Sequence, residues 1–211
     1  MPRRRLNSNF IQNLNQMKRT AFLISFFSLA MTFMAFSPAE KGEKVPDFSG
    51  LDENGNTWTL SKQRSEYIVV YFYPAAFTGG CTKQACSFRD HDAEFSKLNA
   101  TIIGVSGDEY ESLGKFKAHH NLNFTLLSDK DGKIAEVFGV PVKEGKTIEK
   151  EVDGEMLQLT RSVTTARWTF ILDANGKLIY KDSEVSAATD PETVLNFLTT
   201  HDERKSCTPR N

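Results

Sequence analysis

The stretch that decides the fold is residues 71–90, with the sequence YFYPAAFTGGCTKQACSFRD. The apolar and aromatic run at residues 67–73 is typical of a fully buried strand, and Pro74 ends it because proline lacks the backbone N–H that a sheet requires. After Gly79-Gly80 the apolar residues recur at helical spacing. The segment therefore predicts a buried strand, a turn and a helix over residues 81–99.

A cysteine, Cys81, stands at the predicted start of this helix. The unpaired backbone N–H groups and the positive end of the helix dipole favour a thiolate at such a position. Thr78 lies three residues before Cys81 and supplies a hydroxyl, while Cys86 lies five residues after it and supplies a second thiol. The pattern Pro-x-x-x-Thr-x-x-Cys, followed by a second cysteine, predicts a redox nucleophile with its own resolving thiol.

This segment resembles the active-site motif of the peroxiredoxins, and the spacing Cys-x-x-x-x-Cys is similar to that of their bacterioferritin comigratory protein, or Q-type, subfamily. The likeness runs from about Lys44 to Asp202 and includes LLSD at residues 126–129 and RWTFILDANGKL at residues 167–178. Gly79 departs from the motif, because the family usually has proline there. A glycine in place of proline costs up to about 1 kcal/mol of stability through backbone entropy, and it removes no reacting group.

The resemblance implies a thiol peroxidase that reduces hydrogen peroxide and organic hydroperoxides. The Cys81 thiolate would attack the peroxide and become a sulfenic acid. Cys86 would then condense with it to an intramolecular disulfide, which thioredoxin or a similar dithiol would reduce. Pro74 would shield the thiolate from water. No cofactor is expected, and the oligomeric state is expected to be a monomer or a weak dimer.

Thiolate formation alone is too small an effect to explain such catalysis. Lowering a thiol's pKa from about 8.5 to about 6 raises the thiolate fraction at pH 7 about thirtyfold, whereas enzymes typically reach about 10⁶-fold or more. The larger effect must come from donors aimed at the peroxide oxygens as the O–O bond breaks. The expected donors are the backbone N–H groups of Gly80 and Cys81, the Thr78 hydroxyl and a fixed cation.

Arg167 is the expected cation, because it directly precedes an apolar strand at the place where the family has its catalytic arginine. Arginine keeps its charge when buried and presents several donors in one plane. The alternative is a surface arginine at a strand end, and Arg161 is the nearby competitor for the role. Arg89 and Asp90 are expected to form a structural pair on the helix.

The spacing of the two cysteines also predicts a conformational change. On an ideal helix, residues five apart have Cα atoms about 8.7 Å apart, whereas disulfides tolerate about 7 Å at most. The first turns of the helix must therefore unwind before Cys81 and Cys86 can be joined.

The composition fits one well-packed domain in a chain of 211 residues with 39% hydrophobic residues. Residues 1–39 hold five basic residues and no acidic one, so the remainder carries 21 basic and 27 acidic residues. A mildly acidic body argues against nucleic acid as a partner. Three cysteines are too few for a disulfide scaffold. Cys207, in the polar tail, is either an incidental thiol or an alternative resolving or intermolecular cysteine.

Residues 1–39 are expected to form a signal peptide or N-terminal leader. Residues 21–36 are an uncharged apolar run after Lys18-Arg19, short for a membrane span and suited to a signal-peptide core. Ser37-Pro38-Ala39 offers small residues for cleavage near Glu40, so we expect export to the periplasm. An uncleaved membrane anchor and an organelle transit peptide are the alternatives, and Met17 would itself make a normal start.

The rest of the chain alternates between strand and helix patterns. It predicts a thioredoxin-like three-layer α/β/α fold with a central mixed sheet over residues 40–202, followed by a polar tail at 203–211. A turn at Asn54-Gly55 precedes the first expected strand, Asn175-Gly176 marks a hairpin, and Asp190 is expected to be the N-cap of the last helix. The expected strands are residues 57–60, 67–73, 101–106, 124–128, 168–172 and 178–180, and the expected helices are residues 81–99, 109–120, 133–138 and 189–200.

Residues 147–160 form an additional predicted hairpin around Asp153-Gly154. Pairing across that turn puts four apolar residues on one face together with Lys150 and Glu155. Such a face needs something to lie on. The hairpin is either surface decoration or a flap or partner surface near the active site, because it immediately precedes the segment that carries Arg167. The four apolar residues are Ile148, Val152, Leu157 and Leu159.

Two other functions fit the expected fold. An exported thiol–disulfide oxidoreductase would need Cys-x-x-Cys at the helix start, and a copper-binding chaperone of thioredoxin fold would need Cys-x-x-x-Cys and a distant histidine. Cys81 and Cys86 have four residues between them, and both alternatives leave Thr78 and Arg167 without a role. The four histidines (91, 119, 120 and 201) do not have metal-ligand spacing, so no metal is expected.

Overall fold

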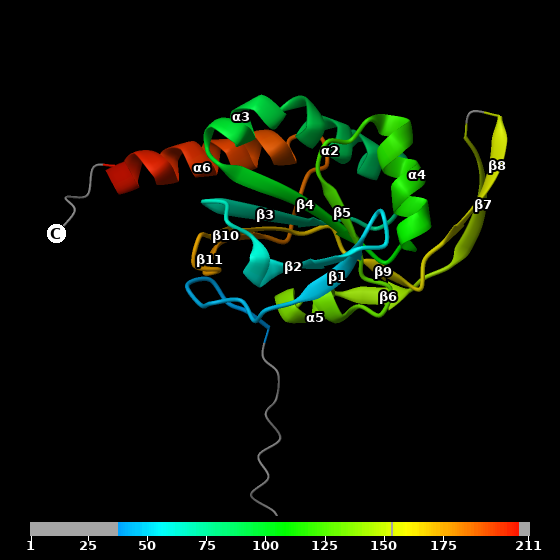
Figure 1. Cartoon of the computed structure of the whole chain (residues 1–211), viewed down its shortest axis with the longest axis horizontal. Helices are drawn as coiled ribbons and strands as arrows, with labels where there is room; N and C mark the ends of the chain where they lie inside the picture. The colour runs from blue at the N-terminus through cyan, green and yellow to red at the C-terminus, as the bar shows by residue number, and fades with distance from the viewer. Residues whose placement is uncertain (1–37, 153, 207–211) are drawn as a thin grey trace, which may run out of the picture. The chain divides into compact units, whose positions relative to one another are not determined.

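The computed structural model, which describes residues 38–152 and 154–206, is built on a seven-stranded mixed sheet in the order β11-β10-β3-β4-β5-β1-β2 (Figure 1). The three inner strands β3, β4 and β5 are parallel, whereas β10, β11, β1 and β2 join antiparallel. The strands are β1 (Ser49–Asp52), β2 (Thr57–Thr59), β3 (Tyr67–Phe72), β4 (Ala100–Ser106), β5 (Thr125–Ser128), β10 (Thr169–Asp173) and β11 (Leu178–Asp182).

The strand β3 is buried along its whole length. Its side chains alternate between the two faces of the sheet. Tyr67, Val69 and Tyr71 enter one hydrophobic cluster, and Ile68, Val70 and Phe72 enter the other. A strand buried on both faces requires a layer on each side, as the continuous apolar run predicted.

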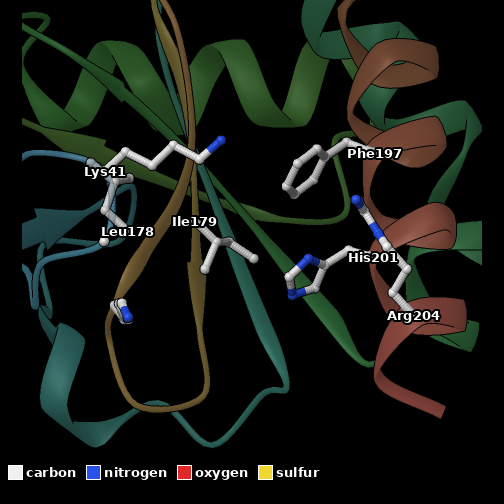
Figure 2. Close-up of a pocket in the computed structure, with 8 residues that line it drawn as sticks. Lys41, Leu178, Ile179, Phe197, His201 and Arg204 are labelled. Carbon is white, nitrogen blue, oxygen red and sulfur yellow. The ribbon is translucent and has the colours of Figure 1, made fainter. Parts of the chain in front are cut away.

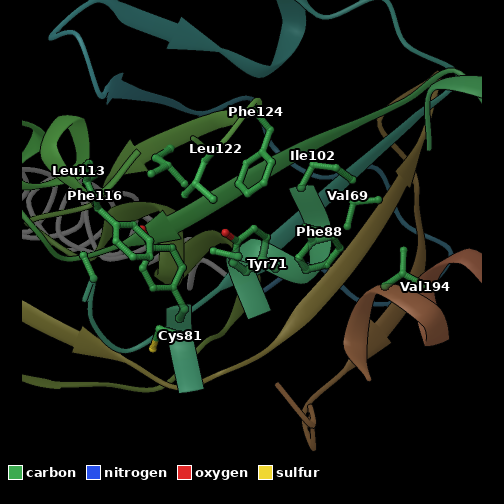
Figure 3. Packing of buried hydrophobic residues seen from close by; sticks show 14 of the residues in the cluster. Val69, Tyr71, Cys81, Phe88, Ile102, Leu113, Phe116, Leu122, Phe124 and Val194 are labelled. Carbon is green, nitrogen blue, oxygen red and sulfur yellow. The ribbon is translucent and has the colours of Figure 1, made fainter. Parts of the chain in front are cut away.

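Four helices cover the face that carries Tyr71, where their apolar residues pack with Val69 and Tyr71 (Figure 3). These helices are α2 (Gly79–Asp90), α3 (Asp92–Lys97), α4 (Tyr110–His120) and α6 (Asp190–Ser206). The other face packs against α5 (Lys133–Phe138), the 3-10 turn η1 (Leu60–Lys62) and the segment that leads into β1. The predicted three-layer α/β/α arrangement with a mixed sheet is confirmed.

The helix predicted over residues 81–99 is two helices. It starts two residues earlier, at Gly79, and breaks at His91, which caps the end of α2 and precedes α3. The His91 ring nitrogen Nδ1 lies 2.8 Å from the Ser87 carbonyl, which also accepts the His91 N–H. The break lets Phe88 and Phe95 pack 5.7 Å apart against the same face of the sheet.

The last helix also differs from its prediction. It continues to Ser206, six residues past the predicted end and past the predicted domain boundary at Asp202. The prediction that Asp190 is its N-cap is wrong, because Asp190 Oδ2 accepts hydrogen bonds from two other side chains and Oδ1 has no partner. This carboxylate is turned into the protein rather than toward the helix backbone.

The additional hairpin is present with the predicted register, from Thr147↔Thr160 to Val152↔Glu155, as β7 (Thr147–Val152) and β8 (Glu155–Thr160). Leu157 and Leu159 are buried in the same cluster as Tyr71, so the apolar face lies on the body of the protein. A second strand pair at its base, β6 (Val142–Glu144) with β9 (Val163–Thr165), was not predicted.

The predicted leader and Cys207 lie outside the described residues, apart from Pro38 and Ala39. Ala39 is buried, and its N–H donates to the Val137 carbonyl at 3.1 Å, so this residue packs as part of the body. Among the residues that the structure describes, none of the helices has the length and apolarity needed to span a membrane.

Candidate active site

Cys81 lies in the first turn of α2 and is 2% exposed, at the edge of the cluster that contains Tyr71 and Phe88 (Figure 3). Its Sγ accepts a hydrogen bond from Arg167 Nη2 at 3.2 Å. The structure therefore brings together two residues that the sequence singled out separately, a thiol at a helix start and a fixed cation.

The start of α2 leaves donors around the thiol. Thr78 is the N-cap with φ −93° and ψ 147°, and its side chain makes no capping hydrogen bond. Instead, Thr78 Oγ1 donates to the Ala75 carbonyl at 2.9 Å, and in the described part of the chain no hydrogen bond joins it to Cys81. The backbone N–H groups of Gly79, Gly80 and Cys81 have no intrahelical acceptor, because the first turn of a helix lacks one. These N–H groups and the helix dipole favour negative charge beside Cys81.

The turn before Thr78 is strained. Phe77 has a φ of 58°, a left-handed conformation that costs a non-glycine residue about 1 kcal/mol or more. Its ring is buried and packs edge-on against Phe116. Lys150 Nζ, from β7, donates to the Phe77 carbonyl. The additional hairpin thus contacts the turn that positions the active-site helix.

The Arg167 guanidinium binds two partners at once. Nη2 donates to Cys81 Sγ, and Nη1 donates to Gln84 Oε1. A Cβ built on Gly80 would lie 3.5 Å from Arg167 Nη2, so the guanidinium also lies close to the first-turn backbone. Because the guanidinium is a rigid plane, its two hydrogen bonds fix the orientation of that plane.

Gln84 is fully buried and continues this network. Its Nε2 donates to Asp190 Oδ2 at 2.6 Å, and Thr169 Oγ1 donates to the same oxygen at 2.8 Å. Burial raises the pKa of Asp190 to about 6, against the hydrogen bonds from Gln84 and Thr169, which favour the charged form. At neutral pH the carboxylate is therefore mostly ionised.

Arg161, the competitor for the catalytic cation, occupies a different place. It is buried, and its Nη1 lies 3.7 Å from Asp108 Oδ1. Asp108 Oδ2 accepts the Ala76 N–H at 2.8 Å, so this ion pair supports the loop between β3 and α2. Burial raises the pKa of Asp108, and the hydrogen bonds from Ala76 and Ser106 act against that shift. The structure brings Arg167, not Arg161, into contact with the thiol.

Cys86 is half-buried and lies in the same continuous helix as Cys81, and both are free cysteines in this structure. Arg89 and Asp90 form the expected pair, with Nη2 2.7 Å from Oδ1, and Arg89 Nη1 also donates to the His120 carbonyl. The hydrogen bond to Asp90, aided by the nearby Cys86, raises the pKa of Arg89.

Pro74 is half-buried and directly follows Tyr73, whose carbonyl accepts a hydrogen bond from Thr165 Oγ1 at 3.0 Å.

Three residues of this site were not found from the sequence: Gln84, the side chain of Asp190, and Lys150. Gln84 lies three residues after Cys81, so helical spacing alone places the two on neighbouring positions of one face. Lys150 was predicted to lie on the apolar face of the hairpin, and this position could have indicated its contact with the body of the protein. The role of Asp190 depends on tertiary packing between α6 and α2 and has no local signal.

The described surface has several hollows, of which two bear on the residues named so far. One, of about 370 Å³, lies beside the start of α2 and is lined by Phe77, Gly79, Thr82, His119, His120, Lys150, Glu151 and Val152. The other, of about 470 Å³, lies between β11 and α6, with Leu178, Ile179 and Phe197 flanked by basic side chains such as Lys41 and Arg204 (Figure 2). None of the predicted site residues lines the second hollow. Among the described residues, no group of three or more His, Cys, Asp or Glu side chains is placed to hold a metal ion.

Comparison with known proteins shows the family to which the chain is similar. Residues 41–181 match the family model described as the AhpC/TSA family. The chain is 44% identical over 140 residues to peroxiredoxin Bcp of Bacillus subtilis (strain 168), covering 66% of this chain and 82% of that protein. The crystal structure of peroxidoxin BcpB from Mycobacterium tuberculosis is similar with a TM-score of 0.64 and 32% identity, covering 77% of this chain and 97% of that one. A structure from a study of alkyl peroxide reduction by the Xanthomonas campestris bacterioferritin comigratory protein is similar with a TM-score of 0.60 and 29% identity, covering 73% of this chain and 91% of that one.

Proposed function

Because the chain belongs to the AhpC/TSA family and is a thiol peroxidase with a thioredoxin-like peroxiredoxin fold, we propose that Cys81 is its peroxidatic cysteine and Cys86 its resolving cysteine. The observation that carries this assignment is the 3.2 Å contact between Arg167 Nη2 and Cys81 Sγ at the start of α2. A cation and a helix start that converge on one thiol stabilise a thiolate there. Cys86 lies in the same helix as Cys81, but it contacts neither the Arg167 guanidinium nor the free N–H groups of the first turn. The two rival functions, a thiol–disulfide oxidoreductase and a copper chaperone, are not favoured by these relatives.

In the first step, the Cys81 thiolate attacks one oxygen of a hydroperoxide. The S–O bond forms as the O–O bond breaks, sulfur loses two electrons, and the leaving oxygen takes a proton and departs as water or an alcohol. The Arg167 guanidinium and the N–H groups of Gly80 and Cys81 stabilise the charge that develops on the oxygens. The Thr78 hydroxyl donates to the Ala75 carbonyl, so it is not the donor to the peroxide that the sequence predicted, and its oxygen is available instead to accept the O–H of the incoming hydroperoxide.

In the second step, the Cys86 thiol attacks the Cys81 sulfenic acid. A disulfide forms and water leaves. On the intact helix α2 the two Cα atoms are about 8.7 Å apart by ideal geometry, beyond the limit of about 7 Å for a disulfide. The first turns of α2 therefore unwind in this step. Thioredoxin, or an equivalent dithiol of the periplasm, then reduces the disulfide by thiol–disulfide exchange.

The substrates proposed are hydrogen peroxide and organic hydroperoxides. The similar structure of the Xanthomonas campestris bacterioferritin comigratory protein, which concerns alkyl peroxide reduction by that protein, supports the second class. The hollow beside the start of α2 supports it too, because Phe77 and Val152 give it an apolar lining that an alkyl group could contact. The protein is proposed to act as a monomer or a weak dimer.

The apolar run at residues 21–36 supports export and cleavage near Glu40. The intact mass of the protein purified from its native host tests this proposal. A mature chain that begins near Glu40 is expected. A species that retains residues 21–36 in the membrane fraction would show an uncleaved anchor instead.

The direct test of the proposed function is a single-turnover experiment with three cysteine variants. Cys81→Ser is expected to abolish peroxide reduction. Cys86→Ser is expected to consume about one equivalent of hydrogen peroxide and to stop as a sulfenic acid that a dimedone-type reagent traps. Cys207→Ser is the matched control and is expected to turn over normally. Normal turnover of Cys86→Ser with thioredoxin would overturn the resolving role, and a large loss in Cys207→Ser would transfer that role to Cys207.

A further inference from the structure

We propose that Asp190 is a positioning residue for peroxide reduction: it fixes the Gln84 side chain and, through it, holds the Arg167 guanidinium against Cys81 Sγ. This inference rests on the proposed function, in which Arg167 stabilises the reacting atoms. Asp190 itself acts at a distance, through two side chains.

The contacts form one continuous chain from α6 to the thiol. Asp190 is 2% exposed, and its Oδ2 accepts from Gln84 Nε2 at 2.6 Å. Gln84 Oε1 accepts from Arg167 Nη1, and Arg167 Nη2 donates to Cys81 Sγ at 3.2 Å. Each link is a side-chain hydrogen bond, and α6, α2 and the segment before β10 each contribute at least one member.

The chemistry of an amide explains why Asp190 determines the direction of this chain. A glutamine side chain has one oxygen, which accepts, and one NH₂ group, which donates. A guanidinium can only donate, so Gln84 must turn its oxygen toward Arg167. The Asp190 carboxylate can only accept when it is ionised, so it holds the NH₂ group on the opposite side. If Asp190 is removed, Gln84 loses one of the two interactions that select this orientation, and its NH₂ group loses its acceptor.

The orientation of Gln84 in turn sets the direction of the second Arg167 donor. The guanidinium is planar, and its donors keep fixed angles to one another. When Nη1 is held by Gln84, Nη2 is aimed at Cys81 Sγ and lies close to Gly80. A guanidinium held by a single contact would be free to rotate away from the thiol.

The stability of the fold does not explain why a carboxylate occupies this position. Asp190 Oδ1 is buried and has no hydrogen-bond partner, and burying a charge without full pairing is costly. An uncharged side chain of similar size would pack there at lower cost. The charged groups that face Asp190 are of both signs: Arg167 favours the ionised carboxylate, and Asp182 opposes it. The carboxylate is instead explained by its bond to Gln84.

The test measures the rate of Cys81 oxidation by hydrogen peroxide in the Cys86→Ser background, followed by the intrinsic fluorescence of the two tryptophans, of which Trp168 is next to Arg167 in the chain. Asp190→Ala is expected to slow oxidation about tenfold, the effect of losing a hydrogen bond to a charged group. Asp190→Asn keeps an acceptor oxygen for Gln84 and is expected to recover most of the rate. Thr193→Val, near the start of α6, removes a side-chain hydrogen bond outside the chain of contacts and is the matched control.

A double-mutant cycle separates positioning from a structural role. If Asp190 acts through Arg167, then Asp190→Ala has no further effect on the rate in an Arg167→Ala protein. An equal slowing in both backgrounds, or a wild-type rate in Asp190→Ala, would overturn the proposal. Asp190→Leu, of similar volume, replaces the alanine variant if that variant does not fold. Failure of the parent Cys86→Ser protein to be oxidised would instead refute the proposed function.

Discussion

Arg167 Nη2 lies 3.2 Å from Cys81 Sγ, although 86 residues separate the two along the chain. The register between β10 and β3 explains the contact. Thr169 pairs with Tyr71, and the Phe72 N–H donates to the Trp168 carbonyl at 2.8 Å. Arg167 therefore enters the sheet beside the loop that follows β3, where α2 begins with Cys81. The antiparallel pairing of β10 with β3 thus places the Arg167 guanidinium beside the Cys81 thiol.

Arg167→Lys should slow the oxidation of Cys81 by about 10- to 100-fold. Lysine keeps the positive charge but cannot hold Gln84 and Cys81 together from one plane, and a hydrogen bond to a charged group is worth about 1.5–3 kcal/mol. Stopped-flow oxidation of the Cys86→Ser protein measures the effect. Arg161→Lys is the control and should lower the urea midpoint while the rate stays within about twofold of the parent rate. Equal slowing in the two variants would contradict the assignment.

Lys150→Met should change the preference among hydroperoxides. The variant keeps an apolar stem and loses the donor to the Phe77 carbonyl, next to a hollow lined by Phe77, Lys150 and Val152. The ratio of rate constants for cumene hydroperoxide and hydrogen peroxide should change by about threefold or more, the effect of one net hydrogen bond. Lys146→Met, at an exposed position before β7, should leave the ratio unchanged. An unchanged ratio in both variants would leave the hairpin without a part in substrate choice.

Gly79→Pro should stabilise the protein by about 0.4–1 kcal/mol through the entropy of the unfolded chain. Gly79 is the first residue of α2, the position where proline is favoured, and in the described chain a Cβ there would meet no atom within 4 Å. The ψ of 147° at Thr78 also suits a residue before proline. Urea unfolding measures the gain, with Gly79→Ala as the comparison. A loss of stability with proline would show that the turn needs a glycine.

Asp190→Asn should gain stability relative to the wild type as the pH rises. Burial raises the pKa of Asp190 to about 6, and an unfolded aspartate has a pKa of about 3.9. Between these values the folded state binds more protons, so the contribution of this group is greatest below pH 4 and is lost as the pH rises through 6. The loss amounts to at most about 3 kcal/mol, at 1.36 kcal/mol per pKa unit.

Urea unfolding of the wild type and Asp190→Asn at pH 4.5 and pH 7.5 measures this effect. The difference between the two proteins should favour the variant more at pH 7.5. Asp129, whose pKa burial raises to about 6, titrates in both proteins and cancels in the comparison. The same difference at both pH values would show that the Asp190 carboxyl titrates normally in the folded state.

The elements that could be predicted from the sequence are those with a strong local pattern. The run at β3 is apolar on both faces, and the 147–160 hairpin has alternating residues around Asp153-Gly154, so burial and register followed directly. Cys81 and Arg167 could each be named because the resemblance to the peroxiredoxin motif assigns a role to each, although their contact was not visible in the sequence.

The features that could not be predicted depend on contacts between distant segments. The break at His91 is needed for Phe88 and Phe95 to share one face of the sheet, and the hydropathy pattern runs through it without interruption. Asp190 has the residue type and position of an N-cap, yet Gln84 and Thr169 draw its carboxylate inward. The strands β6 and β9 are separated by the whole hairpin, so no turn signal links them.

Hydrogen exchange in the reduced and the disulfide-bonded protein tests the central claim most directly, namely that helix α2 unwinds so that Cys81 and Cys86 can form their disulfide. The account predicts that amides at residues 80–88 exchange faster in the oxidised form, because α2 must unwind to join the two thiols. Amides of β3 (Tyr67–Phe72) and of residues 194–198 in α6 should be equally protected in both forms. Equal protection of residues 80–88, with the Cys81–Cys86 disulfide confirmed by mass, would contradict the account.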